Sequence, residues 1–397
     1  MLFWGVAVLE IDKYLSLSYS VYMDIIRFYH ELSKHLVSNK VLIIYGPRQA
    51  GKTTLLKQFL ENSGLKYKLD SGDNIKIQHL LSSQDFDLLR EYVSGYELLA
   101  VDEAQKIPNI GVNLKILVDQ VPNLKIIVTG SSSFELAGQV GEPLTGRKIT
   151  LTLYPVAQLE LLDMYNKHEL KDKISEWVIF GGYPEIIVTA GRDKKIKLLD
   201  ELVYSYLLKD ILELDHIKNS KKLLDLLRLL AFQIGNEVSL SELGKQLGMD
   251  HKTVERYLDI LEKAFVIYNL RGFSRNLRKE ITKKSKYYFY DNGIRNAIIS
   301  NFNDIDQRND IGALWENFIF MERCKKRSYH AIAANPYFWR TWEGQEIDLI
   351  EEREGKLFAY EFKWNESKAK PPHKWTEAYQ NSVFSVVNKK NYLKFVT

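Results

Sequence analysis

One short segment limits what this chain can fold into more than any other. In "VLIIYGPRQAGKTTLL" an apolar run over residues 41–45 meets the pattern Gly46-x4-Gly51-Lys52-Thr53, and a helical pattern follows. A strand, a glycine-rich loop and a helix N-terminus in this order let backbone amides wrap the β- and γ-phosphates of a nucleotide. Lys52 adds a mobile cation, and Thr53 offers its hydroxyl to Mg2+. The residues predicted to bind ATP here are Gly46, Pro47, Arg48, Gln49, Ala50, Gly51, Lys52, Thr53 and Thr54.

A second apolar segment, "ELLAVDEAQKIPN", ends in Asp102 and Glu103. A carboxylate at the tip of a strand beside a phosphate loop can hold the Mg2+ ion, and the next carboxylate can polarise the attacking water. Asp102 is therefore a predicted metal ligand, and both acids are predicted catalytic residues. The alternative is that the two acids cap the N-terminus of a helix.

Arg147 follows a glycine in "GEPLTGRKITLTLYP", in a loop that precedes a strand pattern. A positioned arginine can stabilise charge on a transferred phosphoryl group, often from a neighbouring subunit. Arg147 is a candidate for that catalytic role, which would make the protein a homo-oligomer. The alternative is an ordinary loop arginine.

Five segments together carry a family resemblance: "YGPRQAGKTTLL", "VDEAQKIPN", "VTGSSS", "LTGRKITLTLYP" and "FGGYPE". They resemble a family of archaeal and bacterial AAA+-type ATPases whose C-terminal region has no functional name. The resemblance spans residues 23–397. It implies an α/β P-loop core with a helical lid, and ATP hydrolysis by Lys52, Thr53, Asp102 and Glu103.

The same resemblance implies two further ATP contacts. In AAA+ ATPases a polar residue at the tip of the third strand senses the γ-phosphate, and Ser131 is the first choice here, with Thr129 next. Ser131–Ser133 could equally be a plain helix N-cap. Pro184, in the segment 181–184, resembles a Gly-x-Pro element that lies near the nucleotide base, with a simple glycine turn as the alternative.

The middle of the chain predicts a winged helix. In "EVSLSELGKQLGMDHKTVERYLDILEKAFVIYNL", Ser239 or Ser241 can cap a short helix that ends near Gly248. Asp250 can cap a second helix over residues 251–264, which gives helix–turn–helix spacing. The strand patterns "FVIYNL" and "KYYFYD" complete the motif.

Basic residues gather around these strands. From Val266 to Ser300 there are eight Lys or Arg residues against Glu280 and Asp291, which suits a phosphate backbone. His251 lies at the exposed start of the expected recognition helix. The alternative is a protein-interaction module with a solvated hairpin. The residues predicted to contact DNA are Lys252, Thr253, Arg256, Arg271, Arg275, Arg278, Lys279, Lys283 and Lys284.

The last part of the chain places acids in one helical pattern and two strand patterns. Glu316 lies in the helical pattern "IGALWENFIFMERCKKR", Asp348 in a strand pattern, and Glu361-x-Lys363 in the next strand pattern. This order resembles the PD-(D/E)XK nuclease fold, a restriction-endonuclease-like α/β domain. In that fold two or three carboxylates bind Mg2+ or Mn2+, and the lysine positions or activates a water. Glu343 or Glu346 could assist. The alternative is the same fold kept as a DNA-binding or dimerising platform.

Length and composition set the remaining expectations. A chain of 397 residues predicts two to four domains, and a net charge of +4 is too small to indicate nucleic acid by itself. The single cysteine, Cys324, excludes an intramolecular disulfide and fits a reducing cytoplasm. The apolar start is too short for a membrane span and lacks the basic start of a signal peptide, so no membrane association is expected. The predicted domains are an extension or misplaced start (1–22), the ATPase core (23–160), the lid (161–235), the winged helix (236–300) and the nuclease-like domain (301–397).

Three hypotheses follow. The first is an ATP-dependent DNA-processing enzyme, the second a nucleotide switch that binds a protein partner, and the third an ATP-driven remodeller of branched or duplex DNA with an inactive nuclease fold. The intact Asp348, Glu361 and Lys363 favour the first.

Overall fold

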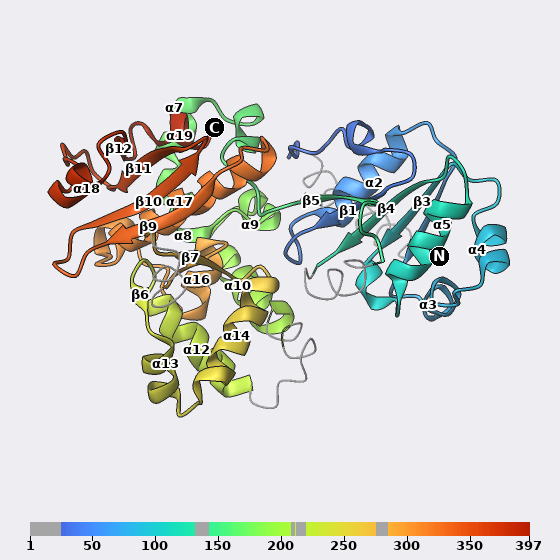
Figure 1. The fold of residues 1–397 in the computed structure, drawn as a ribbon, viewed down its shortest axis with the longest axis horizontal. Coiled ribbons are helices and arrows are strands. Elements are labelled where there is room, and N and C mark those ends of the chain that lie inside the picture. Colours follow the sequence, from blue (N-terminus) through green and yellow to red (C-terminus); the bar gives the residue numbers. More distant parts are fainter. Residues whose placement is uncertain (1–24, 132–142, 208–210, 212–219, 275–284) are drawn as a thin grey trace, which may run out of the picture.

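A computed structural model of the chain describes residues 25–131, 143–207, 211, 220–274 and 285–397. Figure 1 shows two lobes: one carries the elements from β1 to β5, and the other carries everything that follows. The predicted extension over residues 1–22 lies outside the described residues. Within the described ranges, no helix is both long and apolar enough to cross a membrane.

The first lobe is built on a five-stranded sheet with the order β2-β3-β4-β1-β5, in which every neighbouring pair is parallel. All five residues of β1 are buried, as expected of a parallel sheet that is covered on both faces. Because the strands are parallel, their carboxyl ends share one edge, where the phosphate loop begins. The strands are β1 (Val41–Tyr45), β2 (Tyr67–Ser71), β3 (Leu98–Asp102), β4 (Lys125–Gly130) and β5 (Lys148–Thr152).

Helices cover both faces of this sheet. Leu55 and Leu56 of α2 pack on the face formed by Leu42 and Ile44, and the helix α5 packs on the opposite face. This alternation places apolar side chains in two separate cores above and below the sheet. The helices are η1 (Leu32–His35), α2 (Lys52–Asn62), α3 (Ile75–Leu81), α4 (Phe86–Tyr92), η2 (Ala104–Lys106) and α5 (Ile110–Gln120).

The second lobe begins with short helices, in agreement with the helical pattern of the sequence. In α7, the Asn166 side chain accepts hydrogen bonds from the first turn, and Glu169 bonds back to the Asn166 amide, which forms a capping box. The elements are η3 (Glu160–Asp163), α7 (Lys167–Asp172), α8 (Ile174–Phe180), α9 (Pro184–Val188), α10 (Arg192–Glu201) and η4 (Leu202–Leu207).

Three helices and a small antiparallel sheet follow, and the sheet has the order β6-β8-β7. Gly248 ends α13 in the left-handed region with φ 58°, and the Asp250 side chain accepts from the Thr253 amide at 2.9 Å. Both turn predictions are therefore confirmed. Ser239 takes the N-cap position of α13 without a side-chain capping bond. The elements are α12 (Ser220–Phe232), β6 (Glu237–Val238), α13 (Leu240–Leu247), α14 (His251–Lys263), β7 (Ile267–Arg271) and β8 (Ser285–Phe289).

The chain ends in a four-stranded mixed sheet with the order β12-β11-β10-β9. Strands β9, β10 and β11 are antiparallel, whereas β12 lies parallel to β11. The long helix α17 packs on this sheet through Trp315, Phe318 and Ile319. The elements are α16 (Asn292–Ile298), η5 (Ile305–Gln307), α17 (Ile311–Tyr329), β9 (Asn335–Arg340), β10 (Glu346–Arg353), β11 (Lys356–Phe362), α18 (His373–Ala378), β12 (Val383–Val387) and α19 (Tyr392–Val396).

The two small sheets of the second lobe are joined. Just after β7, Gly272 bridges to Phe338 of β9, and the Phe273 amide donates to the Phe338 carbonyl at 2.6 Å. Because of these contacts between the two sheets, the second lobe packs as one connected body rather than as separate modules.

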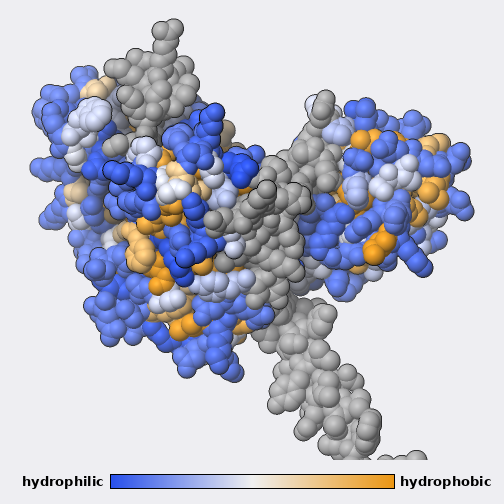
Figure 2. Space-filling view, turned by 90° about the horizontal axis from the view of Figure 1, so that it is seen from below, coloured by the Kyte–Doolittle hydropathy of each residue, from blue (hydrophilic) through white to orange (hydrophobic). Residues whose placement is uncertain are grey.

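The surface of both lobes in Figure 2 is mostly hydrophilic, with smaller hydrophobic patches between.

Candidate functional site

The phosphate loop has the geometry that its sequence predicts. The Lys52 side chain is buried, and its Nζ donates to the carbonyls of Gly46 at 2.9 Å and Pro47 at 2.8 Å. Gly46 must be glycine, because a Cβ there would lie 2.0 Å from the Leu153 carbonyl oxygen. Lys52 thus holds the loop in a curved form that leaves the N-terminus of α2 directed at the site.

The tips of two neighbouring strands, β3 and β4, meet the start of α2 next to this loop. The Thr53 hydroxyl donates to Asp102 Oδ2 at 2.8 Å, and the Thr129 hydroxyl donates to Asp102 Oδ1. The Glu103 amide donates to Thr129 Oγ1 at 3.1 Å. A hydroxyl and a carboxylate are the hard oxygen donors that Mg2+ prefers, so Thr53 and Asp102 fit the predicted ion. We call the loop 46–53 with Asp102 and Glu103 the nucleotide site.

Glu103 is held by a residue that the sequence analysis missed. Its backbone is in the left-handed region at φ 51°, and its Oε2 accepts from Gln105 Nε2 at 2.5 Å. Gln105 also donates to Ser131 Oγ at 3.1 Å, which joins Glu103 to the predicted γ-phosphate sensor. Gln105 Oε1 is buried and has no hydrogen-bond partner among the described residues. The sequence signal for this contact was that Gln105 lies only two residues after Glu103.

Arg27 is a second residue missed from the sequence. Its guanidinium donates to the Ala50 carbonyl in the phosphate loop and to the Tyr154 carbonyl at 2.6 Å. Its Nε lies 3.0 Å from Glu160 Oε1, and both side chains are buried. Arg27 therefore ties the phosphate loop to the start of the second lobe.

The other predicted nucleotide contacts differ in position. A Cβ on Gly51 would lie 3.9 Å from Pro184 Cγ, so Pro184 is beside the phosphate loop. Arg147 instead precedes β5 at the opposite edge of the sheet, and its Nε lies 2.6 Å from Asp119 Oδ1 of its own chain. Arg147 does not reach the nucleotide site of the same chain, and its action on a neighbouring subunit stays a prediction.

The C-terminal acids also come together. Glu316 Oε1 accepts from Lys286 Nζ at 3.0 Å and from the Tyr288 hydroxyl at 2.6 Å. Asp348 is buried and accepts from the Phe362 amide at 2.7 Å. At the end of β11, Lys363 Nζ lies 2.6 Å from Glu361 Oε1. We call Glu316, Asp348, Glu361 and Lys363 the carboxylate cluster.

Electrostatics show that these acids interact. Burial raises the pKa of Asp348 well above its usual range, the carboxylates of Glu316 and Glu361 raise it further, and Lys286 opposes them. Burial lowers the pKa of Lys363, but the neighbouring Glu361 outweighs that effect and raises it. When all three acids are ionised, three carboxylates face only Lys286 and Lys363, and a bound cation would favour that ionised form. Within the described ranges, however, no group of three or more His, Cys, Asp or Glu is arranged so that it could already hold a metal ion.

Two of the eight basic residues counted between Val266 and Ser300 are not on the surface. Lys286 and Arg295 are buried, the first against Glu316 and the second against Asp310. They do not face solvent, so the basic count of the sequence overstated the exposed charge. The sequence signal for the burial of Lys286 was its place within a strand, β8, whose following residues are all buried.

The predicted DNA contacts that can be placed are on α14 and β7. Lys252, Arg256 and Arg271 are exposed. Thr253 also has a role in capping α14, because its hydroxyl and its amide both donate to Asp250. The predicted contacts outside the described residues are Arg275, Arg278, Lys279, Lys283 and Lys284.

Comparisons with known proteins agree with the nucleotide site. A family model described as an AAA domain matches residues 38–162. The first lobe has a P-loop ATPase core. Two models described as domains of unknown function, DUF8612 and DUF4143, match residues 171–305 and 311–393 of the second lobe.

Relatives with similar sequences do not add a function. An uncharacterized protein of Mycobacterium tuberculosis is 28% identical over 328 residues, which is 81% of this chain and 70% of that protein. An uncharacterized protein of Methanocaldococcus jannaschii is 26% identical over 337 residues, 79% of this chain and 73% of that protein. Among solved structures, AMPPCP-bound DnaA from Aquifex aeolicus is 17% identical with a TM-score of 0.25, over 62% of this chain and 87% of that one.

Proposed function

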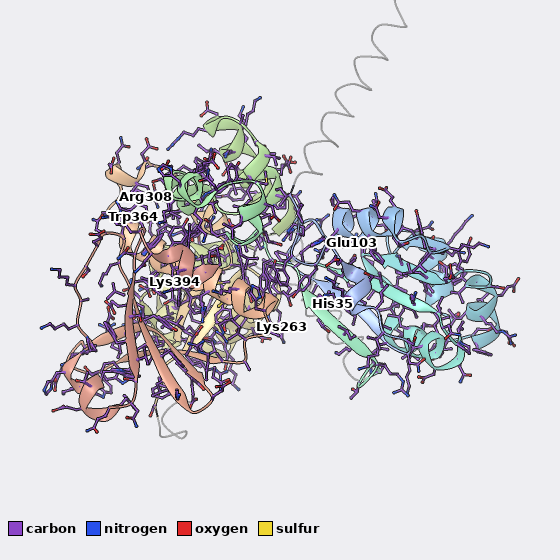
Figure 3. All side chains as sticks on the ribbon, turned by 90° about the horizontal axis from the view of Figure 1, so that it is seen from above. His35, Glu103, Lys263, Arg308, Trp364 and Lys394 are labelled. Carbon is purple, nitrogen blue, oxygen red and sulfur yellow. The ribbon has the colours of Figure 1, made fainter. Side chains whose placement is uncertain are left out.

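We propose that this protein hydrolyses ATP, binds DNA with its second lobe, and couples its nucleotide state to metal-dependent cleavage of that DNA. The observation that carries the proposal is the carboxylate cluster, which lies in the same chain as a nucleotide site where Thr53 contacts Asp102 and the Glu103 amide contacts Thr129. Figure 3 shows Glu103 on the side of the first lobe that faces the second, which supports communication between the two.

For ATP hydrolysis, each side chain of the nucleotide site has a distinct role. Lys52 would exchange the Gly46 and Pro47 carbonyls for phosphate oxygens. Thr53 and Asp102 would hold Mg2+, which screens the phosphate charge when bound. Glu103 would accept the proton of the attacking water, and Gln105 would keep its carboxylate oriented.

For DNA binding, the supporting observation is the order of elements from α12 to β8. A helix, a short strand, two helices and two antiparallel strands would make a winged helix, in which the second helix of the helix–turn–helix pair meets DNA. That helix is α14, and its exposed Lys252 and Arg256 would contact phosphates.

For cleavage, the supporting observation is where each acid lies. Glu316 is on the helix α17, Asp348 on the second strand of the C-terminal sheet, and Glu361 on the third, with Lys363 just after it. This order of elements is the one expected of the PD-(D/E)XK fold and supports the proposal. The three carboxylates would hold Mg2+ or Mn2+, which supplies Lewis acidity when bound, and Lys363 would position the attacking water.

The test is a cleavage assay on the full chain. Linear and branched DNA are incubated with Mg2+ or Mn2+, with and without ATP. Metal-dependent cutting that is lost in Asp348→Ala supports the proposal. The matched control is Glu354→Ala, an exposed acid in the turn after β10.

A second candidate rests on the hydrogen bonds of Glu316. Lys286 and Tyr288 already occupy one of its oxygens, which favours a DNA remodeller with an inactive nuclease fold. Tight salt-dependent DNA binding without cutting would support this candidate. ATP hydrolysis without any DNA affinity would instead favour a nucleotide switch that binds a protein partner.

A further inference from the structure

An open groove of about 520 Å³ lies between α7 and α19, two short helices that are far apart in the sequence and side by side in Figure 1. Its walls carry Lys167 and Lys171 from α7, and Lys390 and Lys394 from the segment that ends in α19. Lys167 and Lys171 are four residues apart, so they lie on one face of their helix. The groove therefore has lysines on both walls.

The walls of this groove are fixed to each other. The Tyr392 hydroxyl donates to Gln158 Oε1 at 3.0 Å, and it also contacts the Leu170 carbonyl at 3.4 Å. Tyr392 and Leu170 are both buried. A ligand would meet a groove that is already formed, so little ordering would oppose binding.

The charge of the groove is not neutralised from within the protein. The two acids of α7 have other partners, since Glu169 closes the capping box and Asp172 pairs with His168. Lys390 pairs with Glu366. In the part of the chain that the structure describes, Lys167, Lys171 and Lys394 make no ion pair.

Contacts between neighbouring segments link Lys390, at the edge of the groove, with the carboxylate cluster. Strands β11 and β12 are parallel with Phe362 opposite Val387, and the Lys363 amide donates to the Val387 carbonyl at 3.0 Å. Two residues beyond this pair, Lys389 Nζ lies 5.2 Å from the centre of the Trp364 ring. Figure 3 labels Trp364 and Lys394 on the same lobe. Basic side chains and one aromatic ring thus connect the groove with Lys363.

We infer that this lysine groove binds the phosphate backbone of a nucleic acid and leads it to the carboxylate cluster. The inference rests on the proposed function and names the surface that the substrate follows. The ring of Trp364 would stack on a base near the cluster.

Other classes of partner fit the groove less well. A protein interface needs an apolar centre, and a membrane surface needs exposed apolar side chains that enter the lipid. None of the exposed large hydrophobic residues in the described chain lines the groove, and Leu393 is buried. Four lysines around one groove are an arrangement that binds phosphates.

The test compares the full chain with the variant Lys167→Gln/Lys171→Gln/Lys394→Gln. The matched control is Lys76→Gln/Lys115→Gln, two exposed lysines of the first lobe. Binding of a fluorescein-labelled DNA duplex, and of its single strand, is measured by anisotropy at several salt concentrations. We expect Kd to rise at least about 10-fold, and the salt slope to fall by about 2 to 3, in the groove variant only. The thermal midpoint reports that the variant is folded.

The outcomes separate the groove from the proposed function. If the unmodified chain does not bind DNA, the proposed function fails. If it binds, and the groove variant binds with the same Kd and salt slope, the inference alone is overturned. Inorganic polyphosphate and vesicles with anionic lipid serve as competing probes. If the groove variant loses either of these and keeps its DNA affinity, the groove belongs to that ligand instead.

Discussion

The nucleotide site and the carboxylate cluster both rely on acids and a lysine, but the two regions treat charge differently. Asp102 is surrounded by neutral hydroxyl donors, and Lys52 is held by neutral carbonyls. In the carboxylate cluster, three acids repel one another while Lys286 and Lys363 balance them only in part. The first site is organised by local backbone geometry, whereas the second is organised by opposing charges from distant parts of the chain.

The comparison indicates how each site can be disturbed. A site built on strand tips and a loop depends on the residues that hold the loop in place. A site built on opposing charges depends on the balance of those charges, and therefore on pH and on added cations.

The largest expected effect is on stability, from loss of the buried support of the nucleotide site. Arg27→Ala would leave Glu160 as an unpaired buried charge, and we expect a loss of about 3 to 5 kcal/mol in the free energy of unfolding. Urea denaturation measures it. The matched control is Arg147→Ala, whose pair with Asp119 is exposed and contributes at most about 1 kcal/mol. Equal losses in the two variants would contradict the tie between the lobes.

The next effect is on catalysis at the nucleotide site. Lys52→Ala is expected to lower ATP turnover at least about 100-fold, because it removes a charge that stabilises the transferred phosphate. Phosphate release measures it, with the exposed Lys57→Ala on the same helix as the control. Retained turnover in Lys52→Ala would remove the basis of the phosphate-loop assignment.

A smaller effect is expected from the residue that orients Glu103. Gln105→Ala removes a hydrogen bond to a charged group, which contributes about 1.5 to 3 kcal/mol, so kcat should fall roughly 10- to 100-fold. The KM for ATP should stay close to its original value, because the described hydrogen bonds of Gln105 go to Glu103 and Ser131 rather than to the phosphate loop. A change in KM alone would show that Gln105 acts on binding.

The smallest expected effect tests the charge balance of the carboxylate cluster. The raised pKa of Asp348 means that its contribution to stability is present at low pH and is lost as the pH rises through that pKa. In the presence of a metal chelator, Asp348→Asn should therefore raise the thermal midpoint by a few degrees at neutral pH. This gain in the midpoint should become smaller at acidic pH. Scanning calorimetry over a pH series measures it.

Added metal sharpens the same prediction. Mg2+ or Mn2+ should stabilise the original chain and leave Asp348→Asn nearly unchanged, since the variant has less negative charge to bind it. The control is Glu354→Asn, which keeps the cluster intact. A midpoint that does not depend on metal in either protein would point to a cluster that is balanced by Lys286 and Lys363 alone.

Motifs that depend on local backbone geometry could be predicted from the sequence. The phosphate loop, the acids at the tip of β3, the glycine that ends α13 and the Asp250 cap all follow from what a turn or a strand end requires. The elements that carry Glu316, Asp348 and Glu361 could also be predicted, because each acid lies in a clear helix or strand pattern.

Contacts between segments that are far apart in the chain could be found only from the tertiary structure. Arg27 meets Glu160, Lys286 meets Glu316, and Lys167 faces Lys394 across a groove. No local pattern marks such residues, since an arginine or lysine reads as a surface charge until the fold buries it or places another charge beside it. The sequence by itself determined which chemistry each site contains, and packing determined which charges balance it, because electrostatic energy depends on distance and burial rather than on position along the chain.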